Sequence, residues 1–218
     1  MTVAIVIPAF NEAGSIGQVV VGVKSLGHVI VVDDASSDAT ADVAESVGAH
    51  VVRHETNKGY SGALNSGFRT ARDLSADVCV TFDADGQHRA EDLRSILDLM
   101  GRDDVALVIG ARPSQARISE RVFSAYARQR YGIPDILCGL KAYRMDLFDA
   151  RGYFDMIDSI GTELALSSIA HGARWTSFPI AVEIRADQPR MGNALRANWL
   201  IFRALFRVIR ADLGGWRQ

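Results

Sequence analysis

The sequence predicts an α/β protein in which helices flank a mostly parallel β-sheet. Short runs rich in β-branched residues alternate with longer windows whose apolar residues recur at helical spacing. Strands separated by helices of this length form right-handed βαβ units. The chemically distinctive residues follow directly after the strand-like runs, at the edge where ligands bind to such sheets. The chain of 218 residues is long enough for one sizeable core.

The first half of the chain contains five expected strands and the helices between them. The strands are expected at residues 3–7, 29–32, 50–53, 78–82 and 105–109. The helices are expected at residues 12–26, 62–74 and 91–100, and from an N-cap at Ser37 to the neighbourhood of Gly48.

The chain after Gly110 loses this rhythm. Residues 111–135 are polar, rich in arginine and weakly periodic, which predicts a long loop or short helices over the ligand-binding edge. Beyond them we expect a strand at 137–143, a helix at 161–170 and an extended segment at 174–183. The organisation that follows is one domain over residues 1–190 and a helical tail over residues 191–218.

Composition and charge narrow the function classes. The net charge of −2 gives no general attraction to nucleic acid, so we expect no nucleic-acid partner. Two cysteines, Cys79 and Cys138, are too few for a disulfide framework, and we expect buried, reduced thiols. The first residues show no signal-peptide pattern, and no uncharged apolar stretch of about 18 residues occurs. These features favour a cytoplasmic protein.

The segment DADGQH, residues 83–88, places two carboxylates at positions i and i+2 just past a buried strand. Two like charges this close are unfavourable unless a cation neutralises them. Asp83, Asp85 and the amide oxygen of Gln87 suit Mn²⁺ or Mg²⁺, which usually share their remaining positions with substrate phosphates. An acidic turn that caps the next helix is the alternative. The Gln and His that complete the segment favour the metal site.

Two segments near the first strands suggest contacts with a nucleoside. The carboxylate of Asp34, at the end of the second strand, can accept hydrogen bonds from a base or a ribose hydroxyl, while the role of Asp33 stays open. In IPAFNE, the side chains of Pro8, Phe10 and Glu12 could form a wall around the nucleoside. A simple helix cap is equally consistent with this segment.

The segment NKGYSGALNSG, residues 57–67, offers backbone and charge to a phosphate. Gly59 and Gly62 let the backbone approach a ligand closely, and Lys58 is available for a phosphate. The order of a Walker A loop, GxxxxGK[ST], is absent, so this is not a P-loop.

These segments, in this order and at this spacing, resemble family 2 glycosyltransferases, which have the GT-A fold. The closest resemblance is to the dolichyl- and polyprenyl-phosphate sugar transferases, whose pattern runs IPxxNE, VDDxSxDxT, NxGYGxAxxxG, DADxQH and a CGxKAYR-like segment. The last segment is LCGLKAYR here, at residues 137–144. The resemblance covers residues 3–185. Ser61 stands where the family often has glycine, and the transmembrane helices that some members carry have no counterpart.

The resemblance implies roles for individual residues. The residues that would line the nucleotide site are Pro8, Phe10, Glu12, Asp34 and, through its backbone, Ala84. The metal would be surrounded by Asp83, Asp85 and Gln87. Arg112 would reach a phosphate, and Lys141 and Arg144 would lie near the acceptor phosphate or the diphosphate. Glu163 matches an acidic residue before a helix. Arg190 would close over the diphosphate, with Arg185 as the competing candidate.

The resemblance also implies a reaction, namely inverting transfer of a hexose, with mannose and glucose as first guesses. The donor would be a nucleotide sugar and the acceptor a polyprenyl or dolichyl phosphate. Such a phosphate is already an anion, whereas a hydroxyl acceptor would need a base such as Asp135 or Glu163. One alternative is a family 2 transferase acting on a soluble sugar or glycan. Another is a non-catalytic nucleotide-sugar-binding subunit of a membrane complex.

The tail at residues 195–213 is predicted to form an amphipathic helix. One stripe of this helix consists of Leu195, Trp199, Phe202, Phe206, Ile209 and Leu213, and a neighbouring stripe of Arg196, Arg203, Arg207 and Arg210. Apolar residues occupy most of the rest of its surface. Such a helix suits a bilayer surface with anionic headgroups, which would place a peripheral enzyme on the inner face of the membrane. Packing on its own domain or in a homo-oligomer is the alternative.

Overall fold

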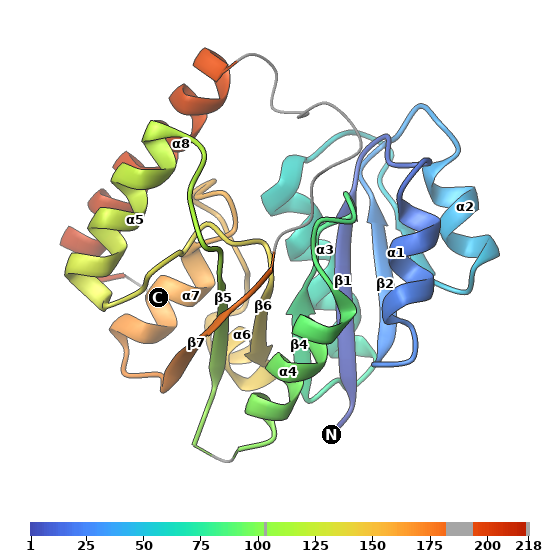
Figure 1. Cartoon of the computed structure of the whole chain (residues 1–218), viewed down its shortest axis with the longest axis horizontal. Helices are drawn as coiled ribbons and strands as arrows, with labels where there is room; N and C mark the ends of the chain where they lie inside the picture. Colours follow the sequence, from blue (N-terminus) through green and yellow to red (C-terminus); the bar gives the residue numbers. More distant parts are fainter. Residues whose placement is uncertain (103, 182–193, 217–218) are drawn as a thin grey trace.

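The computed structural model describes residues 1–102, 104–181 and 194–216, and a seven-stranded sheet runs through these residues. The strands are β1 (Val3–Ala9), β2 (His28–Asp33), β3 (His50–Arg53), β4 (Val78–Thr81), β5 (Leu107–Ala111), β6 (Lys141–Arg144) and β7 (Trp175–Pro179). They lie in the order β3-β2-β1-β4-β6-β5-β7 (Figure 1). Only β6 runs antiparallel to its neighbours, β4 and β5. The prediction of a mostly parallel sheet is therefore confirmed.

Helices cover both faces of this sheet. They are α1 (Ile16–Val23), α2 (Thr40–Ser46), α3 (Gly59–Asp73), α4 (Ala90–Met100), α5 (Ile118–Tyr131), α6 (Met145–Arg151), α7 (Glu163–Ala170) and α8 (Ala194–Leu213). Buried residues of α1, α2 and α4 form one core cluster with the sheet. A second cluster on the opposite face joins residues of α3, α5, α7 and α8. Both free cysteines are buried, as expected.

The first two helices begin later than their sequence pattern predicts. Asn11 has a positive φ of 54°, and its Oδ1 accepts the backbone N–H of Ser37 at 2.8 Å. These contacts hold residues 11–15 as a loop, and α1 begins only at Ile16. The expected N-cap at Ser37 is wrong as well, because Asp38 accepts the N–H of Thr40, where α2 begins.

The region expected to be a loop or short helices contains one helix of 14 residues, α5. Glu120 accepts the N–H of Ala116 at 3.1 Å and pairs with Arg117 at 2.7 Å, which fixes the start of the helix. Gly132, with a φ of 77°, ends it in a left-handed conformation. The sequence shows no clear apolar stripe for this helix, because its buried positions include the polar residues Ser119, Glu120 and Ser124. The short helix α6 was also not predicted.

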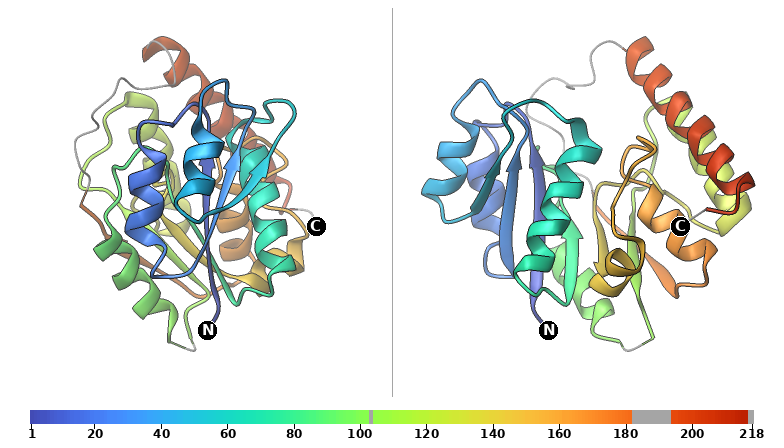
Figure 2. Two further views of the ribbon diagram at one scale, coloured as in Figure 1. Left: turned by 90° about the vertical axis from the view of Figure 1, so that its right-hand side faces the viewer. Right: turned by 180° about the vertical axis from the view of Figure 1, so that it is seen from behind.

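The predicted C-terminal helix is present as α8, and it lies along α5 (Figures 1 and 2). Its buried stripe consists of Ala197, Ile201, Ala204, Leu205 and Val208. Near its end, Asp212 accepts hydrogen bonds from the hydroxyls of Tyr126 and Tyr131, each at 2.6 Å, and pairs with Arg130. The helix thus shares the core of the preceding residues. The boundary drawn at residue 190 lies outside the described residues and stays a prediction.

Within the described part of the chain, no helix is both long and apolar enough to cross a bilayer.

A close contact between α3 and β1 generates a stability prediction. A Cβ atom on Gly67 would lie 2.2 Å from Cγ1 of Val6, inside the core. Gly67→Ala should therefore lower the free energy of unfolding by about 1–3 kcal/mol through overpacking. The measurement is urea denaturation. Gly22→Ala in α1 is the matched control, because its Cβ would meet nothing within 4 Å, and it should stabilise by about 0.5–1 kcal/mol. Equal effects of the two substitutions would contradict the packing at Gly67.

Candidate active site

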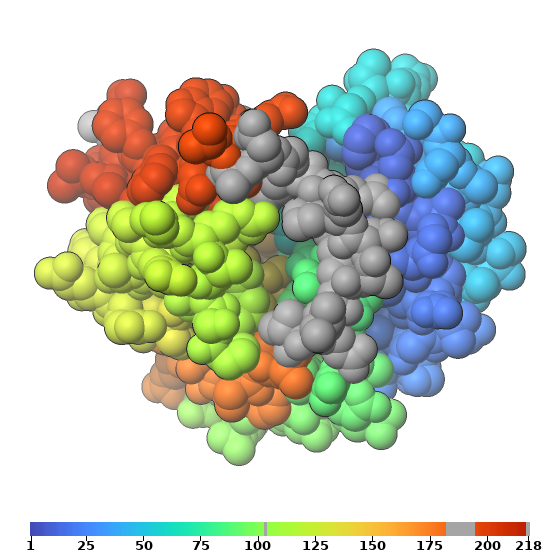
Figure 3. Space-filling model, turned by 45° about the horizontal axis from the view of Figure 1, so that its top comes forward, coloured from blue at the N-terminus to red at the C-terminus, as the bar shows by residue number. Residues whose placement is uncertain are grey.

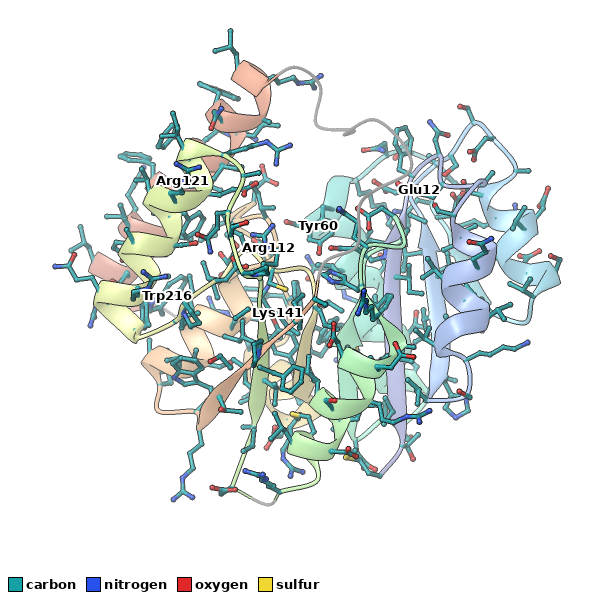
Figure 4. The ribbon with its side chains drawn as sticks, viewed as in Figure 1. Glu12, Tyr60, Arg112, Arg121, Lys141 and Trp216 are labelled. Carbon is teal, nitrogen blue, oxygen red and sulfur yellow. The ribbon has the colours of Figure 1, made fainter. Side chains whose placement is uncertain are left out.

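The segments singled out in the sequence meet at one edge of the sheet. Parallel pairing aligns Ala9 of β1 with Asp33 of β2, and Asp33 with Arg53 of β3. β4 pairs with β1 on the other side, with Thr81 opposite Val6. The loops that follow these strands therefore leave the sheet together. Figure 4 shows Tyr60, Arg112 and Lys141 around the middle of this edge, with Glu12 toward its β1 side.

Asp83 lies at the centre of this edge, two residues beyond β4. His88 Nε2 lies 3.0 Å from its Oδ2, and the Tyr60 hydroxyl donates to its Oδ1 at 3.3 Å. Burial raises the pKa of the Asp83 carboxyl, but His88, Lys141 and Tyr60 outweigh burial and hold this pKa below its usual value. Asp83 is thus an anion at neutral pH, as a metal ligand must be.

The antiparallel strand β6 brings a cation to Asp83. Lys141 is opposite Thr81 in the register, its side chain is buried, and its Nζ donates to the Gly161 carbonyl at 3.4 Å. Burial lowers the pKa of the Lys141 ammonium, while Asp83 is among the charges that oppose this effect. The arrangement can stabilise negative charge that develops on a substrate at this edge.

The backbone before β6 packs directly against the Asp83 carboxylate. A Cβ atom on Gly139 would lie 1.9 Å from Asp83 Oδ2, so no residue but glycine fits without displacing that side chain. The Thr81 hydroxyl fixes the same backbone by donating to the Gly139 carbonyl at 2.6 Å. Gly139 of LCGLKAYR therefore allows this backbone to pack against the acidic segment DADGQH.

The acidic turn itself has the composition of a divalent-cation site. Gly86 adopts a φ of 75°, and the Gln87 N–H donates to Asp85 Oδ1 at 3.1 Å. Ala84 between the two acids is buried. Among the described residues, no group of three or more His, Cys, Asp or Glu side chains stands ready to hold a metal. The two carboxylates and the Gln87 amide oxygen fit a divalent ion that completes its shell with phosphate oxygens.

Asp34 anchors a turn. Its Oδ1 lies 2.6 Å from His54 Nδ1 and accepts the Lys58 N–H, and its Oδ2 accepts the Gly59 N–H, each at 2.8 Å. These contacts fix the start of α3. The expected contact between Asp34 and the nucleotide stays a prediction, and little of this carboxylate remains for a ligand. Asp33 Oδ1, by contrast, is buried without a hydrogen-bond partner among the described residues.

The remaining predicted nucleotide contacts surround the same loops. Phe10 is exposed, Pro8 is half-buried in β1, and Glu12 is buried and accepts the Ser15 hydroxyl at 2.8 Å. The Lys58 side chain is exposed at the N-cap of α3. Phe10 thus offers an exposed apolar surface, and Lys58 an exposed charge next to Asp34.

Arg112 follows β5 as predicted, but its guanidinium is already paired. Its Nε and Nη2 donate to the two Asp135 oxygens at 2.7 and 3.0 Å, and its backbone N–H donates to Oδ2. Asp135 is almost fully buried, so this bidentate pair holds the residues after β5 against those before β6. The expected contact between Arg112 and a substrate phosphate stays a prediction.

The prediction for Arg144 is wrong. Because β6 is antiparallel to β4, Arg144 lies opposite Val78, at the other edge of the sheet. Its guanidinium donates to the carbonyls of Val105, Met100 and Arg102. The sequence pattern could not reveal this, because the direction of β6 separates Lys141 from Arg144 by the length of a strand.

Glu163 lies at the start of α7 as expected, but it holds backbone. It pairs with Arg151 at 2.6 Å, and it accepts the N–H groups of Met156 and Ile157. The side chain is buried, so its carboxylate is committed to shaping this loop. Its expected catalytic role has no support in these contacts. Arg190 and its competitor Arg185 lie outside the described residues.

The sequence model described as Glycosyl transferase family 2 matches residues 4–209. The chain belongs to glycosyl transferase family 2.

Two of its relatives match nearly its whole length. The undecaprenyl-phosphate mannosyltransferase of Micrococcus luteus is 30% identical over 98% of this chain and 95% of that protein. The polyprenol monophosphomannose synthase of Mycolicibacterium smegmatis is 27% identical over 97% and 87%. Glucosyl-3-phosphoglycerate synthase from Mycobacterium tuberculosis, solved with Mn²⁺ and UDP-glucose, superposes with a TM-score of 0.73. That structure is 20% identical and covers 94% of this chain and 78% of its own, which shows the GT-A fold.

Four residues at and around the candidate site of this glycosyltransferase were not singled out from the sequence. His54 and Tyr60 complete the surroundings of Asp34 and Asp83, and His88 was noted only as part of its motif. The signal of Tyr60 and His88 was their place within the two loop segments, and that of His54 was its place directly after β3. Asp155 left no such signal. Its buried carboxylate accepts the Ser61 hydroxyl at 2.7 Å and the Gly161 N–H at 2.9 Å.

The contact between Gly139 and Asp83 predicts a binding defect without loss of fold. Gly139→Ala should displace the Asp83 carboxylate and weaken binding of a nucleoside diphosphate in the presence of Mn²⁺ by roughly tenfold or more. Isothermal titration calorimetry measures this affinity, and thermal unfolding verifies the fold. Gly14→Ala, whose Cβ would meet nothing within 4 Å, is the control and should bind normally. Unchanged binding by a folded Gly139→Ala variant would show that Asp83 is dispensable.

Proposed function

We propose that this chain is an inverting, metal-dependent hexosyltransferase that moves a sugar from a nucleotide donor to a polyprenyl or dolichyl phosphate. The observation that carries the proposal is the Asp83–Asp85 pair at a strand end, with buried Lys141 beside it. The names of the two relatives that match nearly the full length support a polyprenyl-phosphate acceptor and make mannose the first sugar to test.

Asp83, Asp85 and Gln87 would hold Mn²⁺ or Mg²⁺, and the bound ion would offset charge on the diphosphate leaving group. The solved synthase that binds Mn²⁺ and UDP-glucose supports this choice of ions. Pro8, Phe10, Glu12 and the backbone of Ala84 would line the nucleotide. Lys58, exposed at the start of α3, and Lys141, buried in β6, would supply positive charge to the diphosphate. Arg112 and Arg190 remain candidates for closing over it.

The state of the candidate bases favours a phosphate acceptor. Asp135 is paired with Arg112, and Glu163 is paired with Arg151 and two backbone N–H groups. Neither carboxylate is available to take a proton from a hydroxyl without breaking a buried ion pair. A polyprenyl phosphate needs no such base, because it is already an anion at neutral pH. A soluble sugar or glycan acceptor would require one of these pairs to open.

The donor and acceptor can be tested together. The wild-type chain should release nucleoside diphosphate from GDP-mannose or UDP-glucose only when undecaprenyl or dolichyl phosphate and Mn²⁺ or Mg²⁺ are present. Asp85→Asn should lower kcat by roughly 100-fold or more, because it removes a metal ligand. Asp98→Asn on the exposed side of α4 is the matched control.

Three outcomes would contradict the proposal. Retained turnover by Asp85→Asn would remove the metal assignment. Transfer to a soluble glycan in place of the lipid phosphate would select the alternative acceptor. Nucleotide-sugar binding without turnover under any condition would select a binding subunit.

The exposed side of α8 favours peripheral attachment to the cytoplasmic face of a membrane. At about 100° per residue, Leu195, Trp199, Phe202, Phe206 and Leu213 form a stripe opposite the buried one, and all five are exposed. The guanidinium of Arg203 lies 4.9 Å from the Trp199 ring. An exposed aromatic stripe beside arginines suits the boundary between headgroups and acyl chains. Figure 3 shows α5 and α8 forming one side of the molecular surface.

The membrane proposal is tested on this stripe. Truncation before α8 would also remove core residues, so surface substitutions are the sharper test. Trp199→Ser/Phe206→Ser should lower the affinity for anionic vesicles by roughly tenfold or more in a sedimentation assay, because two large apolar side chains no longer enter the bilayer. Val21→Ser on exposed α1 is the control. Two results together would assign the stripe to a homo-oligomer interface. The double variant would sediment with vesicles as the wild type does, and it would be a monomer where the wild type is a dimer.

A further inference from the structure

A cavity separates α8 from the loop that follows α6. It has a volume of about 460 Å³ and is lined by Met156, Ile157, Asp158, Arg207, Arg210 and Ala211. None of these residues belongs to the candidate nucleotide or metal site. Figure 2, in its right-hand view, shows α8 on the outer surface of the molecule. The cavity is therefore separate from the candidate active site. It lies beside α8, the helix that we assign to the membrane surface.

Positive charge in and beside this cavity exceeds the negative charge that faces it. Arg207 Nη1 and Arg203 Nη2 both donate to one oxygen of Asp158, at 2.7 and 3.1 Å. The Arg210 side chain has no hydrogen bond or ion pair within residues 1–102, 104–181 and 194–216. Two guanidinium groups thus share the Asp158 carboxylate, and a third, that of Arg210, lines the cavity beside them. The cavity has the charge of an anion site in which Asp158 occupies only part of the donor set.

The Asp158 contacts are of a kind that another anion can replace. The Asp158 side chain is 58% exposed, and those of Arg203 and Arg207 are 39% and 36% exposed. Ion pairs this exposed contribute little to stability, because water screens them. A phosphate group offers more acceptor oxygens than the one Asp158 oxygen in use, and guanidinium groups bind it with two parallel hydrogen bonds.

The apolar surroundings indicate which phosphate fits. Met156, on the loop side of the cavity, is 72% exposed, and Phe206, on the α8 side, is 61% exposed. Arg207 and Arg210 line the cavity together with Met156, and at about 100° per residue they lie next to Phe206 around the helix. When both side chains enter the acyl boundary of a bilayer, the guanidinium groups lie at the depth of the lipid phosphates. A phosphate free in solution would gain nothing from this apolar rim.

We propose that the cavity between α8 and residues 156–158 binds the headgroup phosphate of an anionic phospholipid, which takes the place of Asp158 on Arg203 and Arg207. The proposal rests on the proposed function, because a bilayer is where a polyprenyl-phosphate acceptor resides. It adds a lipid site distinct from the acceptor site, lined by Arg207 and Arg210.

The loop that carries Asp158 also forms part of the active site. Asp155 at its start accepts the Gly161 N–H, and the Gly161 carbonyl accepts Lys141. A Cβ atom on Gly161 would lie 2.9 Å from the Tyr60 ring, so this backbone packs against the residue that contacts Asp83. A headgroup that displaces Asp158 from Arg203 and Arg207 therefore changes the contacts of the loop that packs against Lys141 and Tyr60.

Binding to vesicles of phosphatidylcholine with phosphatidylglycerol, free of polyprenyl phosphate, tests the site with the full chain. Arg207→Gln and Arg210→Gln should each lower the affinity at least twentyfold. Arg196→Gln removes the same charge from the same helix outside the cavity, and it should lower the affinity about fivefold or less, the contribution of one arginine near an anionic surface. Equal losses in all three variants would overturn the site in favour of diffuse attraction.

A double-mutant cycle isolates the exchange at Asp158. Asp158→Asn should raise the affinity for these vesicles in the wild-type background and raise it by a smaller factor in the Arg207→Gln background, where only Arg203 of the pair remains. Additive effects would overturn the exchange. Inorganic phosphate at constant ionic strength should not compete with the vesicles; full competition would assign the cavity to a soluble phosphate and overturn the lipid proposal.

The transfer reaction separates failure of this site from failure of the proposed function. Arg210→Gln should keep the wild-type kcat with polyprenyl phosphate in neutral detergent micelles and show a raised KM for the same acceptor in anionic vesicles. Equal KM values for Arg210→Gln and the wild type in vesicles would overturn the lipid site and leave the transferase intact. The vesicle-binding results stand without any turnover.

Discussion

The antiparallel insertion of β6 between β4 and β5 is the constraint on which the site depends. Its register sets Lys141 opposite Thr81 and places the Gly139 backbone against the Asp83 carboxylate. A parallel strand in the same position would bring Arg144 to the site and carry Lys141 away. The direction of β6 therefore decides that Lys141, and not Arg144, lies beside the acidic pair. The close approach of the Gly139 backbone to Asp83 explains why a glycine precedes the strand.

Buried carboxylates outside the metal site hold the loops around it. Asp34 accepts the Gly59 N–H at the turn that begins α3. Asp155 accepts hydrogen bonds from Ser61 and Gly161. Asp135, before β6, pairs with Arg112. Each carboxylate is satisfied by several donors, as burial of a charge requires. The consequence for chemistry is that the candidate bases Asp135 and Glu163 are both held in buried ion pairs. An acceptor that is already anionic needs neither of these carboxylates as a base.

The helix α8 joins the core and the proposed bilayer surface in one element. Its buried stripe packs on α5 and shares a core with α3 and α7, while its opposite stripe leaves large apolar side chains exposed. The two readings of this helix from the sequence, packing on its own domain and lying on a membrane, are therefore compatible. The arginines between the stripes reach Asp158, which connects the helix to the loop beneath Lys141.

The sequence by itself determined the alternation of strands and helices, the edge at which the distinctive residues gather, and the composition of the acidic turn. These follow from local patterns, because hydrophobic period and strand ends are visible in a single chain. Only the tertiary structure decided the direction of β6, the occupation of Asp34, Asp135 and Glu163 by partners distant in sequence, and the continuous helix α5. Such features depend on which side chains meet after folding. A residue's type showed that it could bind a ligand, and its neighbours in space decided whether it was free to do so.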